Sequence, residues 1–182
     1  MLVSSRTSAM ARQLRHQGAP LGEVFAWLSA LYFRGKLTYA RAFGGSPGGL
    51  PGSLVMAPGA GLRSPDTRIW SDDLRAMGTV DIESEAFAGP LRRDAALVDR
   101  AYGPDARVVL LGSIATNKYL ATLLDVFGAR LLFPATFVGR GDMSRGGLLL
   151  RSARSREELV YTPVDGARRR GVRPPRLPRL RP

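Results

Sequence analysis

The chain has 182 residues, of which 45% are hydrophobic and 8% aromatic, as expected for a globular protein with a packed core. It contains no cysteine and a single histidine, His16, which excludes disulfides, thiolate chemistry and a multi-histidine metal cage within one chain. No segment approaches the roughly 18–20 apolar residues of a membrane-spanning helix, and the first 20 residues lack the apolar stretch of a signal peptide. We therefore expect a cytoplasmic protein that does not associate with membranes.

The net charge of +12 is concentrated at the two ends of the chain. Residues 1–20 contribute +3 and residues 165–182 contribute +6, so residues 21–164 carry only +3. Arginine outnumbers lysine by 25 to 2, which is also typical of a GC-rich coding bias. The basic ends are therefore compatible both with nucleic-acid binding and with a purely compositional origin.

The first half of the chain predicts a long helix followed by short, loop-rich elements. Residues 1–20 have no strong periodicity and are predicted to be a flexible segment. From Leu21 the apolar residues recur at spacings of three and four, which predicts a helix that ends at Gly35 or continues to Phe43. The elements expected after it are a linker at 44–52, strands at 54–57 and 79–82 separated by a loop, and a helix from Pro90 to Tyr102.

The second half predicts a strand–helix–strand unit. The apolar runs Arg107–Leu111 and Arg130–Phe133 flank a helix at Asn117–Phe127, capped by Thr116 and ended by Gly128. A unit of this length is typical of a right-handed parallel crossover. Two further strands, at 148–151 and 159–162, are predicted to form a C-terminal hairpin.

This order predicts an α/β fold: a small three-layer domain over residues 21–164, with a mixed, partly parallel sheet and a C-terminal hairpin. The tail at 165–182 consists largely of arginine, proline and glycine, with few large apolar residues, and is predicted to be disordered.

The segment Phe137–Leu150 (FVGRGDMSRGGLLL) is the first candidate binding site. Its glycines allow close approach of the backbone to a ligand, and its two arginines suit phosphate or carboxylate. It matches neither a Walker P-loop nor a dinucleotide-binding fingerprint. The residues that we assign to a ligand here are Gly139, Arg140, Asp142, Ser144 and Arg145. The alternative is a connecting loop in which Asp142 pairs with the two arginines.

The turn after strand 107–111 is the second candidate. In open α/β sheets ligands bind beyond the carboxyl ends of the strands, and a helix N-terminus at that place favours anions. The residues that we assign to a ligand here are Gly112, Ser113, Thr116, Asn117 and Lys118. The alternative is a capping turn with a solvated lysine.

Two further segments are weaker candidates. The loop Gly59–Asp73 is rich in charged residues, and with no cysteine any acid–base chemistry would fall on carboxylates such as Asp66, Asp81, Glu83 or Asp142. Tyr32–Tyr39 interleaves aromatic and basic residues, as surfaces that stack nucleic-acid bases do. Surface charge and an amphipathic helix end are the respective alternatives.

The stretches VVLLGSIATNKYL and FVGRGDMSRGGLLLR resemble those of uncharacterised bacterial proteins, and this resemblance implies no activity. From the residues themselves we expect a protein that binds a nucleotide or nucleic-acid fragment at residues 112–118 and 139–147, without metal or cofactor. Hydrolase or transferase activity at this site is left open, as is the oligomeric state. The rivals are a non-catalytic nucleic-acid-binding module that uses its basic tails, and a scaffold for an acidic protein partner.

Overall fold

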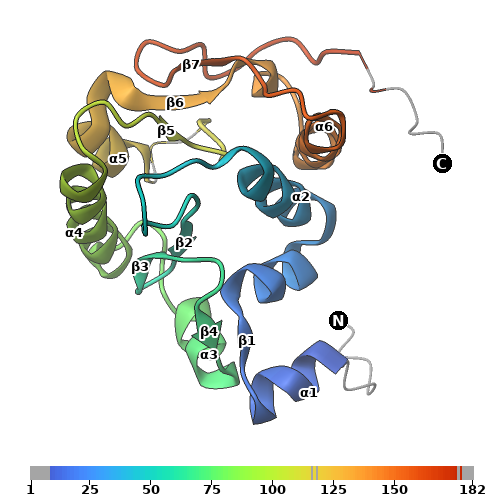
Figure 1. Cartoon of the computed structure of the whole chain (residues 1–182), viewed down its shortest axis with the longest axis vertical. Helices are drawn as coiled ribbons and strands as arrows, with labels where there is room; N and C mark the ends of the chain where they lie inside the picture. Colours follow the sequence, from blue (N-terminus) through green and yellow to red (C-terminus); the bar gives the residue numbers. More distant parts are fainter. Residues whose placement is uncertain (1–8, 116, 118, 176, 178–182) are drawn as a thin grey trace.

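The structure is a computed structural model that describes residues 9–115, 117, 119–175 and 177. It is a small α/β fold with a mixed sheet, as predicted (Figure 1). The elements in chain order are α1 (Ala9–His16), β1 (Ala19–Pro20), α2 (Leu21–Phe43), β2 (Val55–Ala57), β3 (Gly61–Arg63), β4 (Arg68–Ile69), α3 (Ser71–Gly78), α4 (Glu85–Tyr102), β5 (Val108–Val109), α5 (Leu120–Phe127), β6 (Leu131–Pro134), α6 (Asp142–Ser155) and β7 (Tyr161–Pro163). Two single-turn 3₁₀ helices, at Gly128–Arg130 and Ala135–Phe137, lie on either side of β6.

The mixed sheet has the strand order β5-β6-β7 and lies at one end of the molecule (Figure 1). Strand β5 pairs parallel with β6, with Val108 opposite Leu131, which confirms the predicted parallel pairing. Strand β7 pairs antiparallel with the other edge of β6. Two-stranded antiparallel pairs, β1 with β4 and β2 with β3, lie further down the molecule.

The described residues form two hydrophobic clusters. The larger lies between the mixed sheet and helices α4, α5 and α6, and includes Leu91, Leu120, Phe133 and Leu149. The smaller joins α1, the start of α2 and the short strands around Ile69. Its members Leu14 and Ala19 are buried, although residues 1–20 have no strong periodicity and were predicted to be flexible.

The predicted strand at 148–151 is wrong, because these residues lie in α6. A short apolar run has the same appearance in a buried strand and in a buried helix. Here the buried positions are Gly146, Leu149 and Ser152, and their spacing of three is that of a helix face. The predicted hairpin is therefore replaced by α6 followed by β7, which pairs with β6.

Other elements also differ from the predictions: the loop expected after β2 contains β3, β4 and the start of α3, and β5 is shorter than the predicted strand at 107–111. Residues 79–82 form no strand, because Thr79 ends α3 and the Asp81 carboxylate accepts a hydrogen bond from the Glu83 amide in a turn (2.9 Å). Helix α4 begins at Glu85 with Pro90 inside it, and α5 begins at Leu120, three residues after the predicted start.

The predicted flexibility of 1–20 and disorder of 165–182 stay predictions, although residues 9–20 include α1 and β1, and residues 169–175 contact the rest of the chain. Residues 1–8, 176 and 178–182 lie outside the described residues.

Candidate functional site at the N-terminus of helix α6

The two predicted binding segments leave the same edge of the mixed sheet. Strands β5 and β6 run parallel, and residues 112–118 follow the first while residues 139–147 follow the second. The second segment is not a loop throughout, because α6 begins at Asp142 with Gly141 as its N-cap residue. The amide groups of the first turn of a 14-residue helix therefore lie at this edge.

Hydrogen bonds to residues within or just before the start of α6 fix both predicted arginines. Arg140 donates from Nε to the Thr136 carbonyl (3.1 Å) and from Nη1 to the Ser144 hydroxyl (3.1 Å). Arg145 donates to the Phe137 carbonyl (3.3 Å), and its guanidinium lies 5.5 Å from the centre of the Phe137 ring. These contacts limit the rotamers of both side chains, so their charges are held near the first turn of the helix.

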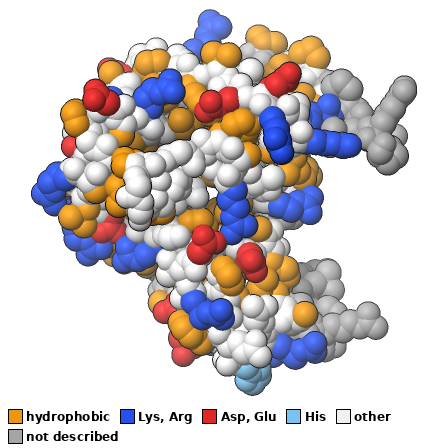
Figure 2. Space-filling view, in the orientation of Figure 1, with side chains coloured by type: hydrophobic (Ala, Val, Ile, Leu, Met, Phe, Trp, Pro, Cys, Tyr) orange, Lys and Arg blue, Asp and Glu red, His pale blue; other side chains and the backbone are white. Residues whose placement is uncertain are grey.

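An open pocket of about 590 Å³ lies over this helix start and is lined by residues 140–145 and by Arg173 from the C-terminal segment. Among the described residues that line it, Asp142 is the only acid, and its Oδ1 lies 3.6 Å from Arg145 Nη1. The Asp142 side chain is 68% exposed, whereas that of Arg145 is 13% exposed. Figure 2 shows basic side chains gathered over α6 and the adjoining C-terminal segment.

Two residues of α2, Tyr32 and Lys36, complete the cluster of polar groups beside α6. The helices touch backbone to backbone, because a Cβ atom on Gly35 would lie 2.7 Å from the Gly146 carbonyl oxygen. The Tyr32 hydroxyl donates to the carbonyl of Leu111, two residues after β5 (3.2 Å), and Lys36 Nζ lies 4.0 Å from the Tyr32 ring centre. The close crossing of α2 and α6 therefore brings residues of α2 to the edge where both predicted segments begin.

Burial shifts the acid–base properties of these two side chains. It raises the pKa of Tyr32 to about 12, although Arg145 acts in the opposite direction. It lowers the pKa of Lys36 to about 8, although the charge of Asp142 favours the ammonium form. Lys36 is thus a cation near neutral pH that loses its charge within the mildly alkaline range.

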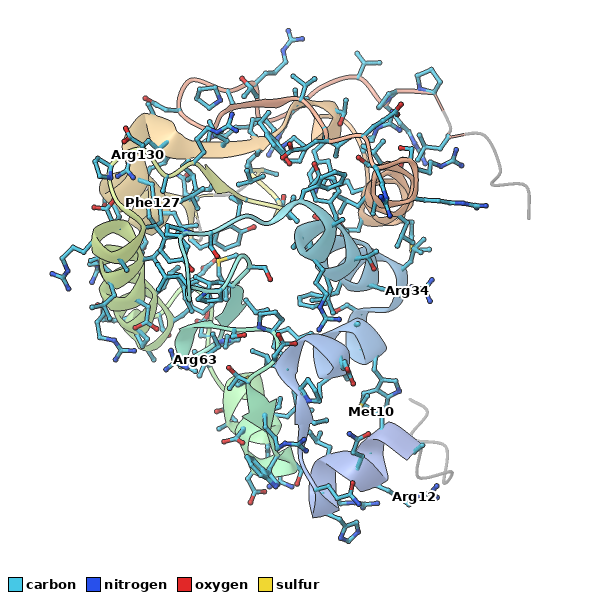
Figure 3. All side chains as sticks on the ribbon, viewed as in Figure 1. Met10, Arg12, Arg34, Arg63, Phe127 and Arg130 are labelled. Atoms are coloured by element: carbon cyan, nitrogen blue, oxygen red, sulfur yellow. The ribbon has the colours of Figure 1, made fainter. Side chains whose placement is uncertain are left out.

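The segment Tyr32–Tyr39, to which both residues belong, was predicted as a separate candidate surface and not as part of the anion site. The alternation of aromatic and basic residues was the available signal, while the crossing with α6 is a tertiary contact. Not every residue of the segment takes part, since Arg34 is exposed and lies on the outer side of α2 (Figure 3).

The turn after β5 directs its polar groups toward neighbouring protein atoms. The Tyr119 hydroxyl donates to the Ser113 carbonyl (2.6 Å), and a Cβ atom on Gly112 would lie 2.7 Å from that hydroxyl. The Ser113 side chain accepts from the Ala115 amide (3.3 Å), and Asn117 accepts from Arg169. Thr116 and Lys118, which were also predicted to contact a ligand, lie outside the described residues.

The predicted residues that the structure describes therefore divide into two groups. Arg140, Asp142, Ser144 and Arg145 meet around one pocket. Gly139 contacts the C-terminal segment instead, and the described members of the turn, Gly112, Ser113 and Asn117, contact Tyr119, their own turn or that segment.

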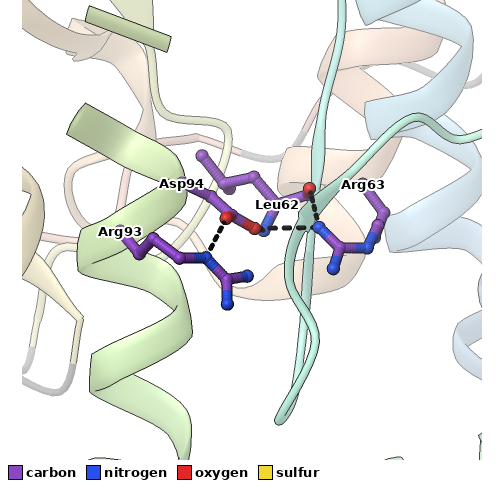
Figure 4. A network of polar contacts seen from close by, with 4 residues as sticks. All are labelled: Leu62, Arg63, Arg93 and Asp94. Carbon is purple, nitrogen blue, oxygen red and sulfur yellow. Dashed lines mark hydrogen bonds and ion pairs between the residues drawn. The ribbon is translucent and has the colours of Figure 1, made fainter. Parts of the chain in front are cut away.

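Charged residues of the loop Gly59–Asp73 form ion pairs and hydrogen bonds with neighbouring elements. Arg63 donates to Asp94 of α4 (2.8 Å), which also accepts from the Leu62 amide (3.0 Å) and from Arg93 (2.8 Å) (Figure 4). Burial acts to raise the pKa of Asp94, but these hydrogen bonds outweigh it and the pKa is lowered. Asp66 pairs with Arg41 (2.8 Å), and Arg68 donates to the Gln17 and Gly18 carbonyls.

Within the part of the chain that the structure describes, no group of histidine, aspartate and glutamate residues could hold a metal ion. In the same part, no helix has the length and apolar character needed to cross a membrane.

No protein-family model matches the chain, and neither the curated proteins nor the solved structures include a significant match.

Proposed function

We propose that the protein binds a phosphate-bearing ligand, a nucleotide or a nucleic-acid fragment, at the N-terminus of α6. The observation on which this proposal rests is that Arg140, Arg145 and Arg173 line one pocket in which, among the described residues, Asp142 is the only acid. The pocket thus has an excess of positive charge where the α6 amide groups also favour an anion.

Arginine is suited to this task because its planar guanidinium binds phosphate oxygens in pairs. Arg145 is largely withdrawn from water and also contacts the Phe137 ring, so its charge is screened less than that of a surface arginine. The exposed Asp142 carboxylate can swing away from Arg145 when an anion arrives, because their contact, Nη1 to Oδ1 at 3.6 Å, is longer than a hydrogen bond.

The test compares Arg140→Ala with Arg154→Ala in the full chain. Arg154 lies in the last turn of the same helix and is exposed, so it controls for the loss of one positive charge. We expect Arg140→Ala to weaken binding of ATP, followed by isothermal titration calorimetry, by about tenfold to a hundredfold, because a charge-assisted hydrogen bond is lost. Arg154→Ala should bind as the wild type does, and equal losses in both variants would refute a specific site.

The main rival is a nucleic-acid-binding module that acts through its basic ends, which hold nine of the twelve net positive charges. It predicts binding of a short single-stranded oligonucleotide that falls steeply with salt and is insensitive to Arg140→Ala. The proposed site predicts that ATP competes with the oligonucleotide and that Arg140→Ala weakens both. Fluorescence anisotropy of the labelled oligonucleotide distinguishes the two.

A further inference from the structure

The C-terminal segment returns to the candidate site after β7. Val164 is buried and its amide donates to the Leu131 carbonyl (2.8 Å), so the chain is still fixed to β6 at this point. Ala167 packs against the larger hydrophobic cluster, and its amide donates to the Val164 carbonyl (3.2 Å). The segment then passes over the residues that precede α6 (Figure 1).

The segment crosses residues 138 and 139 at two glycines. Gly139 has a φ of +76°, and a Cβ atom there would overlap the Val172 carbonyl oxygen. A Cβ atom on Gly171 would lie 2.7 Å from Val138 Cγ1. The Val172 side chain is 93% exposed, so the contact at this place is made by the backbone of the segment.

Contacts on both sides of this crossing fix the segment further. Before it, Arg169 donates to the Asn117 side chain in the turn after β5. After it, the Pro175 carbonyl accepts from Arg140 Nη1 (3.5 Å). Pro174, Pro175 and Leu177 then line a second, more apolar pocket whose other wall includes Leu31, Met143 and Leu150.

We propose that residues 169–175, together with Leu177, are a docked wall of the anion pocket, and that the glycine crossing positions Arg173 as a ligand-binding group. This inference rests on the proposed function. A guanidinium on a freely moving tail must lose conformational freedom when it binds a phosphate, whereas a docked one has already lost most of it. Gly171 is then a positioning residue, and Asn117 anchors the segment rather than contacting the ligand.

The experiment separates docking from charge by using Gly171→Val in the full chain. This variant retains every arginine but places side-chain atoms where Val138 lies. We expect its affinity for ATP to fall by about tenfold, as in Arg173→Ala. The matched control is Gly45→Val, since no atom lies within 4 Å of a Cβ at Gly45, and it should bind as the wild type does.

A second measurement reports docking directly. Trypsin cleaves after Arg170, next to the crossing, so the rate of this cleavage rises when the segment leaves its position. We expect faster cleavage in Gly171→Val than in Gly45→Val, and slower cleavage of the wild type when ATP saturates it. The melting temperature of Gly171→Val should stay close to that of Gly45→Val, because Val138, which Gly171 contacts, is only partly buried against the larger hydrophobic cluster.

The outcomes distinguish this inference from the proposed function. Wild-type affinity and cleavage in Gly171→Val, together with weakened binding in Arg140→Ala, would overturn the docked wall and leave the pocket in place. Unchanged binding in Arg140→Ala would overturn the proposed function itself. Parallel losses in Arg140→Ala, Arg173→Ala and Gly171→Val would support both.

Discussion

Two clusters in this molecule combine arginine with a single aspartate, and they are built in opposite ways. At the junction of β3 and α4 the carboxylate is buried: the Asp94 side chain is 10% exposed, while Arg63 and Arg93 are 38% and 60% exposed. At the start of α6 the cation is withdrawn from water instead, since Arg145 is 13% exposed and Asp142 is 68% exposed.

The difference separates a structural cluster from the proposed binding cluster. Asp94 accepts three close hydrogen bonds from side chains and backbone, so its charge is compensated by the protein alone. Arg145 meets its carboxylate at a longer distance of 3.6 Å, and further arginines line the same pocket. An anion from solution therefore has room to bind beside Arg145, whose partner Asp142 is exposed. Asp94 is buried and its hydrogen bonds are already made within the protein, so no such room exists there.

The largest expected effect is on stability, from Asp94→Asn. We expect it to lower the free energy of unfolding by about 3 kcal/mol, because Arg63, Arg93 and the Leu62 amide lose a buried charged acceptor. Urea denaturation measures it. Asp72→Asn is the control, since the Asp72 side chain is 87% exposed and pairs only at the surface, and it should cost less than about 0.5 kcal/mol.

The same comparison has a pH dependence. Because the folded-state pKa of Asp94 is lowered, its contribution to stability is complete above the carboxyl pKa of the unfolded chain, about 3.9. It is lost as the pH falls through the folded-state value. Wild type and Asp94→Asn should therefore converge in stability at acid pH, and a gap that stays constant would contradict the assignment.

An intermediate effect is expected at the crossing of α2 and α6, beside the proposed binding cluster. Alanine is favoured over glycine inside a helix by roughly 1 kcal/mol, yet a Cβ on Gly35 would meet the Gly146 carbonyl at 2.7 Å. We expect Gly35→Ala to destabilise the protein by about 2 kcal/mol and to weaken ATP binding. Gly78→Ala, where no atom lies near the added carbon, controls for the substitution. A more stable Gly35→Ala would show that the crossing is loose.

The smallest effect is expected at Lys36, and it has the opposite sign. Lys36→Met removes the cost of partly burying an ammonium group, so we expect a gain of about 1 kcal/mol at neutral pH together with weaker ATP binding. The folded-state pKa of about 8 lies below the usual lysine value of 10.5, so wild-type stability should rise with pH between these values. Thermal unfolding from pH 7 to 10 should show this rise in the wild type and not in Lys36→Met.

Ligand binding gives the complementary readout for Lys36. Its positive charge is lost as the pH passes about 8, so ATP affinity of the wild type should fall between pH 7 and pH 9. Lys36→Arg retains its charge over this range and should keep its affinity. If the pH dependence persisted in Lys36→Arg, another group would be responsible for it.

The parts of the fold that could be predicted are those in which local signals agree. The runs Arg107–Leu111 and Arg130–Phe133 are apolar, and Gly112 and Pro134 interrupt them, so strand positions and parallel pairing follow. Arg140 and Arg145 could be predicted as partners in one site because they are close in sequence and surrounded by glycines.

The remaining features depend on tertiary contacts that no local pattern encodes. Gly146 has the appearance of a helix breaker, but it lies inside α6 because only a residue without a side chain lets Gly35 of α2 approach. Lys36 and Tyr32 lie beside the candidate site because of that same approach. Asp94 has the sequence context of an ordinary helix residue, and its role comes from Arg63 on a strand 31 residues away.

Helix α2 contributes buried residues to both hydrophobic clusters. Its first turn gives Leu21 and Val24 to the smaller cluster, and Tyr39 near its other end is buried in the larger one. A 23-residue helix is roughly 34 Å long, so one rigid element spans the distance between the two. Neither cluster can lose its order without removing the support that α2 gives to the other, and this coupling favours a single cooperative unfolding transition over two independent ones.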